Sequence, residues 1–151
     1  MLGGETLNEL GEALRDAEIE IEGGLSPRLS PFAEIKDAGN LLGRAGFALP
    51  VADTETITVS YDNPLKLMTD LRGMGETNSN MHRRTTFSRR ATLMRAAEIY
   101  ARKFMNDEGR MPATFEIIYL TAWVPHESQQ KPLSPGSGQV SLGNVFMDDA
   151  L

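Results

Sequence analysis

The 151-residue chain contains no cysteine, and this absence removes several kinds of chemistry at once. Disulfides, zinc–thiolate centres, iron–sulfur clusters and cysteine nucleophiles all require a thiol and are excluded. Histidine is scarce as well, since His82 and His126 are the only two in the chain. Most histidine-built metal sites need more ligands than this, so we expect no metal site.

Long apolar runs are also absent. None approaches the ~20 consecutive apolar residues that cross a bilayer, and the acidic N-terminus is unlike a signal peptide. We therefore expect a cytoplasmic chain with no membrane partner. Apolar residues make up 40% and charged residues 24% of the chain, which is typical of a folded globular domain.

The net charge of −6 argues against a dedicated nucleic-acid binder, so we expect no nucleic-acid partner. The charge is unevenly distributed, because residues 1–37 hold nine of the 21 acidic residues and residues 82–110 hold eight of the 15 basic ones. Such an asymmetry can serve an acidic partner. Two solvated helix faces are the commoner cause, and the carboxylates of the first helix are interpreted in that way.

Apolar residues repeated at three- and four-residue steps predict four helices. Thr6 and Glu9 form the pattern of a capping box for the first helix, which Gly23 ends. Three further helices are expected, over residues 31–45 with Ser30 as N-cap, 64–73 after Asn63, and 88–105. Residues 74–86 are polar and poorly periodic, and they predict a loop.

Two segments have the pattern of strands. In residues 47–61 the side chains of Ile57, Val59 and Tyr61 share one face. Residues 115–124 are apolar on both faces, a pattern that belongs in the interior of a sheet.

Particular side chains of the second strand carry further expectations. Tyr119 and Trp123 are expected in the core, and Glu116 is expected to form an ion pair, because an unpaired charge in an apolar strand is costly. Residues 126–151 predict a loose polar tail.

These elements make a thin α/β set of about four helices and two or three strands. A strand that is apolar on both faces needs more partners than this chain supplies, so the sheet is predicted to be incomplete. Helices can bury what remains, a second chain can supply strands, or the chain can be part of a larger domain.

Several motifs together resemble a known family. They are LGGETL at 2–7, SPRLSPF at 26–32 running on to RAGFALP at 44–50, LRGMGETN at 71–78, PATFEIIYLTAW at 112–123 and SQQKP at 128–132. In this order they look like the C-terminal half of class I S-adenosylmethionine-dependent methyltransferases. They are most similar to the alphaproteobacterial and mitochondrial complex I assembly methyltransferase-like group, which is related to malonyl-carrier-protein O-methyltransferases. The resemblance extends to about residue 138.

The resemblance implies a fold and a division of the chain. Residues 1–125 resemble the C-terminal, substrate-side portion of a Rossmann-like methyltransferase fold. Residues 64–109 correspond to a helical, lid-like insertion, and residues 115–124 to the seventh strand. The cofactor of the family is S-adenosylmethionine, held on a glycine-rich turn after a strand. The Gly73-Met-Gly75 segment follows a predicted helix, so it departs from this pattern.

That departure leads to an expectation about the chain by itself. We expect no cofactor-binding residues, no bound cofactor and no activity in the isolated chain. The expected partner is a missing N-terminal half, or a second copy of the chain pairing through an open sheet edge. Members close to the assembly group hydroxylate an arginine rather than transfer a methyl group, and a protein substrate is compatible with either reaction.

The best candidate site residues are Arg72, Glu76 and Asn78. They lie on either side of Gly73 and Gly75, and glycines let the backbone approach a ligand. Arginine can hold a carboxylate or phosphate through two hydrogen bonds. The resemblance puts these residues on the substrate side of the cleft. The same segment can instead be a helix stop with a solvated loop. Arg28 is a further candidate for an anionic substrate group, or a residue that fixes its own loop.

Two hypotheses about function follow. In the first, the chain supplies acceptor recognition and a lid to a methyltransferase, without a catalytic residue that can be identified. In the second, it is a non-catalytic assembly or interaction module that binds a partner through its sheet edge or its basic fourth helix.

Overall fold

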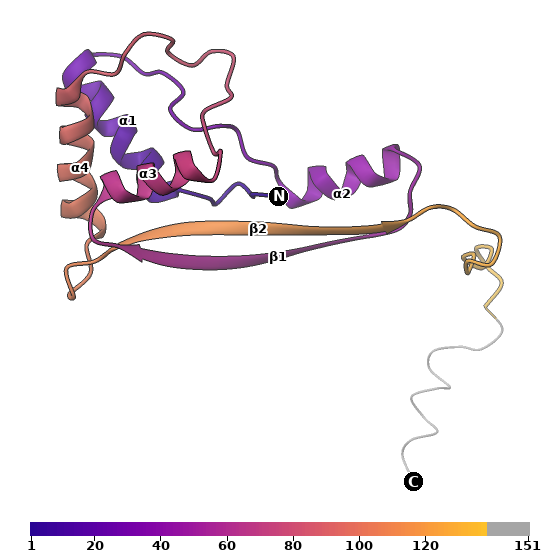
Figure 1. Cartoon of the computed structure of the whole chain (residues 1–151). Helices are drawn as coiled ribbons and strands as arrows, with labels where there is room; N and C mark the ends of the chain where they lie inside the picture. The colour runs from indigo at the N-terminus through magenta and orange to yellow at the C-terminus, as the bar shows by residue number, and fades with distance from the viewer. Residues whose placement is uncertain (139–151) are drawn as a thin grey trace.

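The computed structural model describes residues 1–138. In that part of the chain four helices and two long strands follow one another in the predicted order (Figure 1). They are α1 (Asn8–Glu22), α2 (Ile35–Arg44), β1 (Ala48–Tyr61), α3 (Pro64–Gly73), α4 (Arg90–Phe104) and β2 (Met111–Trp123). The predicted α/β class with an incomplete sheet is confirmed. Residues 126–138 contain no helix or strand, and the rest of the predicted polar tail lies outside the described residues.

The two strands form an antiparallel pair, in which Ile57 lies opposite Phe115 and Val59 opposite Ala113. Figure 1 shows α1, α3 and α4 gathered at one end of this pair and α2 at the other end. The main core lies under the three gathered helices. Its largest fully buried members include Tyr100, Leu67 and Ile99. The core continues onto the two strands, where its buried and partly buried members are Tyr61, Met111, Ala113 and Phe115.

The extreme N-terminus adds to the other edge of β2. Met1 O accepts a hydrogen bond from Ile118 N at 2.8 Å, and Gly3 N donates to Glu116 O at 2.8 Å. Leu7 N also donates to a β2 carbonyl. β2 therefore lies between β1 and the N-terminal segment, so the prediction of an interior strand holds over the first part of β2.

Beyond Ile118 the outer edge of β2 has no backbone partner among residues 1–138. Because hydrogen-bonding groups alternate along an antiparallel strand, Leu120 and Ala122 direct theirs to this same open edge. Tyr119 is 50% exposed and Trp123 is 49% exposed. The prediction that both aromatic residues are core is thus wrong for the described residues, since no layer of this part of the chain covers that end of the strand pair.

The start of α1 differs from the predicted capping box. The N-cap is Leu7, with φ of 60°, and no side chain caps the helix. Thr6 Oγ1 instead donates to Glu116 O at 3.2 Å, and Glu9 accepts a hydrogen bond from Thr114 N at 3.2 Å. Both side chains hydrogen-bond to backbone groups of β2 and not to the free N–H groups at the start of α1. A tertiary contact therefore overrides a local helix signal.

The start of α2 is also later than predicted. The helix begins at Ile35, and its N-cap Glu34 makes no capping hydrogen bond. The chain before it is extended, because Ala33 N donates to Leu2 O at 3.4 Å in a bridge to the N-terminal segment. Ser30 is used elsewhere, in contacts between loops. By contrast, α3 begins directly after Asn63 as predicted, and Asn63 caps it by accepting a hydrogen bond from Lys66 N at 2.9 Å.

Glu116 does not form the predicted ion pair within the described residues. Its Oε2 accepts a hydrogen bond from Glu5 N at 3.0 Å. This contact needs Gly3, because a Cβ there would overlap the Glu116 carboxylate. A backbone N–H has therefore replaced the expected cation as the partner of the strand carboxylate.

Candidate functional site

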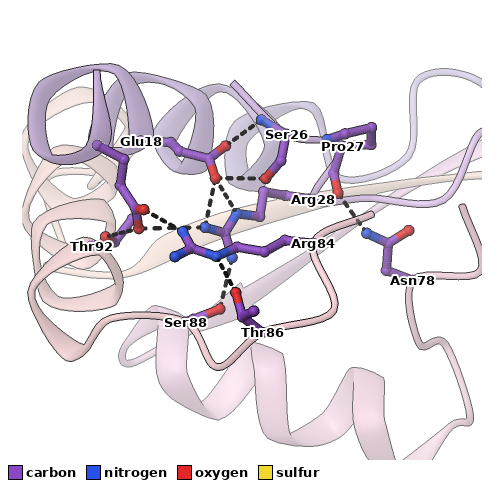
Figure 2. A network of polar contacts seen from close by, with 10 residues as sticks. Glu18, Ser26, Pro27, Arg28, Asn78, Arg84, Thr86, Ser88 and Thr92 are labelled. Carbon is purple, nitrogen blue, oxygen red and sulfur yellow. Dashed lines mark hydrogen bonds and ion pairs between the residues drawn. The ribbon is translucent and has the colours of Figure 1, made fainter. Parts of the chain in front are cut away.

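A buried polar network joins α1 to two long loops, formed by residues 25–33 and 74–89 (Figure 2). Glu18 is only 2% exposed, and its carboxylate accepts hydrogen bonds from the backbone N and Oγ of Ser26 at 2.8 and 2.6 Å. Arg28 Nη2 donates to Glu18 Oε1 at 2.7 Å, and Arg28 Nη1 donates to Ser88 Oγ at 2.7 Å. The network holds the two loops together against the end of α1.

Two opposing effects act on the pKa of Glu18. Burial by itself would raise the pKa, because it penalises the charged form. The hydrogen bonds from Ser26 and the charge of Arg28 favour the carboxylate, and together they hold the pKa of Glu18 below its ordinary value. The interpretation of the acidic face of α1 as solvated is wrong at this position.

Four other carboxylates of α1 meet basic side chains of α4 and of the loop before it. Arg84 pairs with Glu22, and Glu22 also accepts a hydrogen bond from Thr92 Oγ1 at 2.8 Å. Arg95 pairs with Glu20 on the same side of α4. Lys103 bridges two further α1 carboxylates, at 2.6 Å each. Much of the charge asymmetry in the sequence is therefore satisfied between α1 and its neighbours.

The two loops also contact each other directly. Asn78 Nδ2 donates to Pro27 O at 2.7 Å. Ser30 Oγ accepts a hydrogen bond from Ser79 N at 2.9 Å and lies 3.2 Å from Thr77 O. These contacts fix the segment after α3 against the segment after α1, although the two are far apart in the sequence.

A hollow of about 270 Å³ lies where these loops meet the helices. All four predicted site residues line it, namely Arg28, Arg72, Glu76 and Asn78. The rest of its lining is mostly aliphatic and comes from α1, α3, α4 and the 25–33 loop: Leu10, Leu14, Leu29, Met68, Leu71 and Leu93, with Thr77. Their role in binding a substrate stays a prediction.

The four polar residues differ in how they are engaged. Arg28 and Asn78 are bonded to other parts of the network. Arg72 and Glu76 are exposed, and neither forms an ion pair or a side-chain hydrogen bond among residues 1–138. These two charges of opposite sign are thus free to meet a ligand above an apolar floor.

The sequence predicts the polar residues that line the hollow, but not its aliphatic floor or the Glu18 network that holds the loops in place. Glu18 is the main residue missed. Its position was a usable signal, because Glu18 follows Leu14 by four residues and so lies beside the apolar stripe of α1. The structure assigns two leucines of that stripe, Leu10 and Leu14, to both the core and the hollow.

The described residues do not fit an S-adenosylmethionine site of the kind the family uses. Such a site needs a glycine-rich turn between a strand and a helix. β1 leads into α3 through Asp62 and Asn63. Of the glycines around Met74, Gly73 is the last residue of α3 and Gly75 follows the helix. No group of three or more His, Asp or Glu side chains within residues 1–138 is arranged to hold a metal ion.

Comparison with known proteins relates the chain to the class I S-adenosylmethionine-dependent methyltransferases and to the complex I assembly group that its motifs resemble. No family model matches the chain. The arginine-hydroxylase NDUFAF5 of Danio rerio is 45% identical over 145 residues, which are 96% of this chain and 45% of the relative. The protein of the same name from Homo sapiens is 46% identical, again over 96% of this chain and 42% of the relative.

A bacterial methyltransferase is a more distant relative. The malonyl-[acyl-carrier protein] O-methyltransferase of Laribacter hongkongensis is 36% identical over 135 residues, which are 89% of this chain and 43% of that enzyme. The chain spans less than half the length of these relatives. The NDUFAF5 relatives are named mitochondrial, so a cytoplasmic location for this chain stays a prediction. None of the helices described for residues 1–138 is long and apolar enough to cross a membrane.

Proposed function

We propose that this chain is the C-terminal, acceptor-binding portion of an S-adenosylmethionine-dependent enzyme, and that it is inactive without a cofactor-binding half. The observation that carries the proposal is the hollow at the meeting point of the two loops. Four polar residues chosen from the sequence line it together, above a floor of leucines and a methionine. A concave apolar site with a few convergent polar groups is the usual form of a small ligand site.

The lining suits a group with an aliphatic stem and a charged or polar head. Glu76 at the rim can accept hydrogen bonds from a guanidinium, and Arg72 can hold a carboxylate. These chemistries match the names of the relatives, an arginine hydroxylase and a methyltransferase acting on malonyl-carrier protein. The malonyl group in the name of the methyltransferase is attached to a carrier protein, so a protein substrate is part of the proposal.

The sheet supports the view that another half completes the enzyme. The N-terminal segment pairs with β2 only as far as Ile118, and Leu120 lies beyond it on the open edge. Beside this edge is an apolar hollow lined by Met1, Ala38, Leu41 and Leu120, among others. An extended segment continuing the same pairing would bond the free backbone groups of β2 and fill this apolar space.

The test is to join the chain to the cofactor-binding half of the Laribacter relative. The isolated chain should give no heat when titrated with S-adenosylhomocysteine, whereas the fusion should bind it and transfer a methyl group to malonyl-carrier protein. Arg72→Gln and Glu76→Gln should each lower the fusion's turnover or raise its KM without weakening cofactor binding. Saturable cofactor binding or turnover by the isolated chain would contradict the proposal.

A non-catalytic assembly module is the second candidate. It is favoured by the exposed aromatic face of the strand pair, where Tyr119 and Trp123 have no covering layer in the described residues. In this case the fusion would bind cofactor without turnover, and Trp123→Ser would abolish binding to a partner protein. Loss of turnover on changing Arg72 or Glu76 would instead favour the enzyme.

A further inference from the structure

One stretch of this acidic chain carries no acidic residue at all. Residues 77–97 contain five arginines and neither aspartate nor glutamate, in a chain whose net charge is −6. Charges on a protein surface act over about 10 Å at ordinary salt. A partner that approaches this stretch therefore meets a local positive field, whatever the net charge of the whole chain.

Two of the five arginines are neutralised inside the molecule. Arg84 pairs with Glu22 and Arg95 with Glu20 and Glu98. The others make no ion pair among residues 1–138: Arg83, Arg89 and Arg90. The unpaired positive charge is thus concentrated in the loop before α4 and in the first residue of that helix.

Large apolar side chains project between these arginines. Phe87 is 100% exposed and Met81 is 91% exposed. Leaving such side chains in water forgoes about 1.5–3 kcal/mol each relative to burial. We call Met81, Arg83, Phe87, Arg89 and Arg90 the basic apolar surface.

The start of α4 adds a second preference for negative charge. The N-cap Arg89 makes no side-chain capping hydrogen bond, and the first turn contains no acidic residue. The N-terminus of a helix carries free N–H groups and a partial positive charge, so two arginines there are electrostatically unfavourable. Glu22 of α1 already accepts a hydrogen bond from Thr92 Oγ1 in this turn. A carboxylate from another molecule would add to it by meeting Arg89 and Arg90, neither of which forms an ion pair among residues 1–138.

The basic apolar surface adjoins the candidate site. Ser88, between Phe87 and Arg89, accepts a hydrogen bond from Arg28, which lines the hollow. At its other end the surface follows Asn78, which also lines the hollow and is bonded to Pro27 (Figure 2). A partner bound here would therefore lie at the mouth of the hollow.

From these observations we propose that the basic apolar surface is the docking site of an acidic protein partner, whose carboxylates meet Arg83, Arg89 and Arg90 and whose apolar side chains cover Phe87 and Met81. The position beside the hollow favours a protein over a lipid surface, since a protein can deliver an attached group into the hollow. This step rests on the proposed function, in which the acceptor is attached to a protein. The charge and the exposure of the basic apolar surface are observed independently of the proposed function.

The probe is a short helical peptide with leucines on one face and glutamates on the rest. The control is the same peptide with every glutamate replaced by glutamine. Binding to the full chain is measured by fluorescence anisotropy without any cofactor. The glutamate peptide should bind, and its affinity should fall as salt is added. Arg89→Glu/Arg90→Glu should lower that affinity on the order of tenfold, and Phe87→Ser should lower it several-fold.

A matched control is Lys36→Glu/Arg44→Glu in α2, which changes the net charge by the same amount and should leave binding unchanged. Equal binding of the two peptides, or equal losses in the two double variants, would overturn the proposal. So would a stronger preference for phosphatidylglycerol vesicles than for the peptide, which would assign the surface to a membrane. Thermal unfolding of each variant separates lost binding from lost folding. An inactive fusion enzyme with intact peptide binding would overturn the proposed function alone.

Discussion

Arg28 donates two hydrogen bonds to the same oxygen of Glu18, from Nε at 3.1 Å and from Nη2 at 2.7 Å. The pair is nearly buried, with 13% of the arginine side chain and 3% of the glutamate side chain exposed. It joins α1 to the 25–33 loop, and through Ser88 to the loop that precedes α4. The shape of the candidate site therefore depends on this ion pair, and its arginine also lines the hollow.

Breaking this pair from its two ends should have unequal costs. Arg28→Gln leaves the Glu18 carboxylate buried without a cation, and we expect it to lower the free energy of unfolding by about 3 kcal/mol. Glu18→Gln leaves Arg28 with Ser88 and with Glu22, whose carboxylate lies 3.9 Å from Arg28 Nη2, and we expect a loss of about 1–2 kcal/mol. Urea unfolding of both variants measures the difference. Equal costs, or a larger cost for Glu18→Gln, would contradict the assignment of Glu18 as the buried member.

The same network should make the fold sensitive to acid. The pKa of Glu22 is held low chiefly by its hydrogen bond from Arg84, and the pKa of Glu18 is also low. A folded-state pKa below the unfolded value means that the stabilisation is complete above the ordinary pKa of 4.5 and is lost as the pH falls through the folded-state pKa.

Unfolding free energy should therefore decline as the pH drops below about 4.5. The Glu18→Gln/Glu22→Gln variant should be less stable at neutral pH and should lose less on acidification than the wild type. Denaturant titrations across this pH range check both statements. Parallel pH profiles for the two proteins would show that other carboxylates carry the acid sensitivity.

Gly3 and Glu116 should be energetically coupled. A Cβ at position 3 overlaps the Glu116 carboxylate, which must then give up its hydrogen bond from Glu5 N. Gly3→Ala should therefore cost about 1 kcal/mol in the wild type and close to nothing in a Glu116→Ala background. A double-mutant cycle by urea unfolding measures the coupling. Additive effects would mean that the carboxylate is free to move aside.

Local pattern was enough to predict the number and order of the helices and strands, because these depend on residues close in sequence. It did not predict every boundary, since β2 begins at Met111 and not at residue 115. The predicted features all act locally: the apolar stripe of α1, the start of α3 after Asn63, and the alternation of Ile57, Val59 and Tyr61. The start of α1 was not predicted, because Thr6 and Glu9 bond to β2, more than one hundred residues away in sequence. A helix-end signal cannot reveal that a strand competes for the same side chains.

The candidate site was predictable in part for a similar reason. Arg72, Glu76 and Asn78 were predicted from their position on either side of Gly73 and Gly75, which is a local feature. Their shared hollow with Arg28 depends on loop contacts such as Asn78 to Pro27, which are set by tertiary structure. Tyr119 and Trp123 have core-like side chains, yet they are exposed because no described part of this chain covers them.

Substitutions at the rim of the hollow should leave stability unchanged, whereas substitutions in its floor should lower it. Arg72 and Glu76 are exposed, so replacing either with glutamine should leave the unfolding free energy within about 0.5 kcal/mol. Leu14 lies in both the floor and the core, so Leu14→Ala should cost about 2–5 kcal/mol. Thermal unfolding checks this contrast. A large loss of stability in the rim variants would make Arg72 and Glu76 structural residues instead of candidates for binding.

The outer edge of β1 should promote self-association, because along its length it has no strand partner in residues 1–138. The backbone hydrogen bonds of the N-terminal segment go to even-numbered residues of β2, from Met1, Gly3 and Leu7. The backbone groups of the odd-numbered residues of β2 therefore point the other way and bond to β1. Since Ile57 lies opposite Phe115, the N–H of its neighbour Thr56 points outward. A free N–H there can pair with a second copy of the chain.

Thr56→Pro removes this outward donor without removing a hydrogen bond between β1 and β2. We expect it to raise the dimer dissociation constant by about tenfold or more in sedimentation equilibrium. Thr56→Val keeps the N–H and the preference for a strand, so it should associate like the wild type. If Thr56→Pro is folded by near-ultraviolet circular dichroism and still dimerises as strongly, pairing does not run through β1, and the open edge of β2 beyond Ile118 is the contact to vary next.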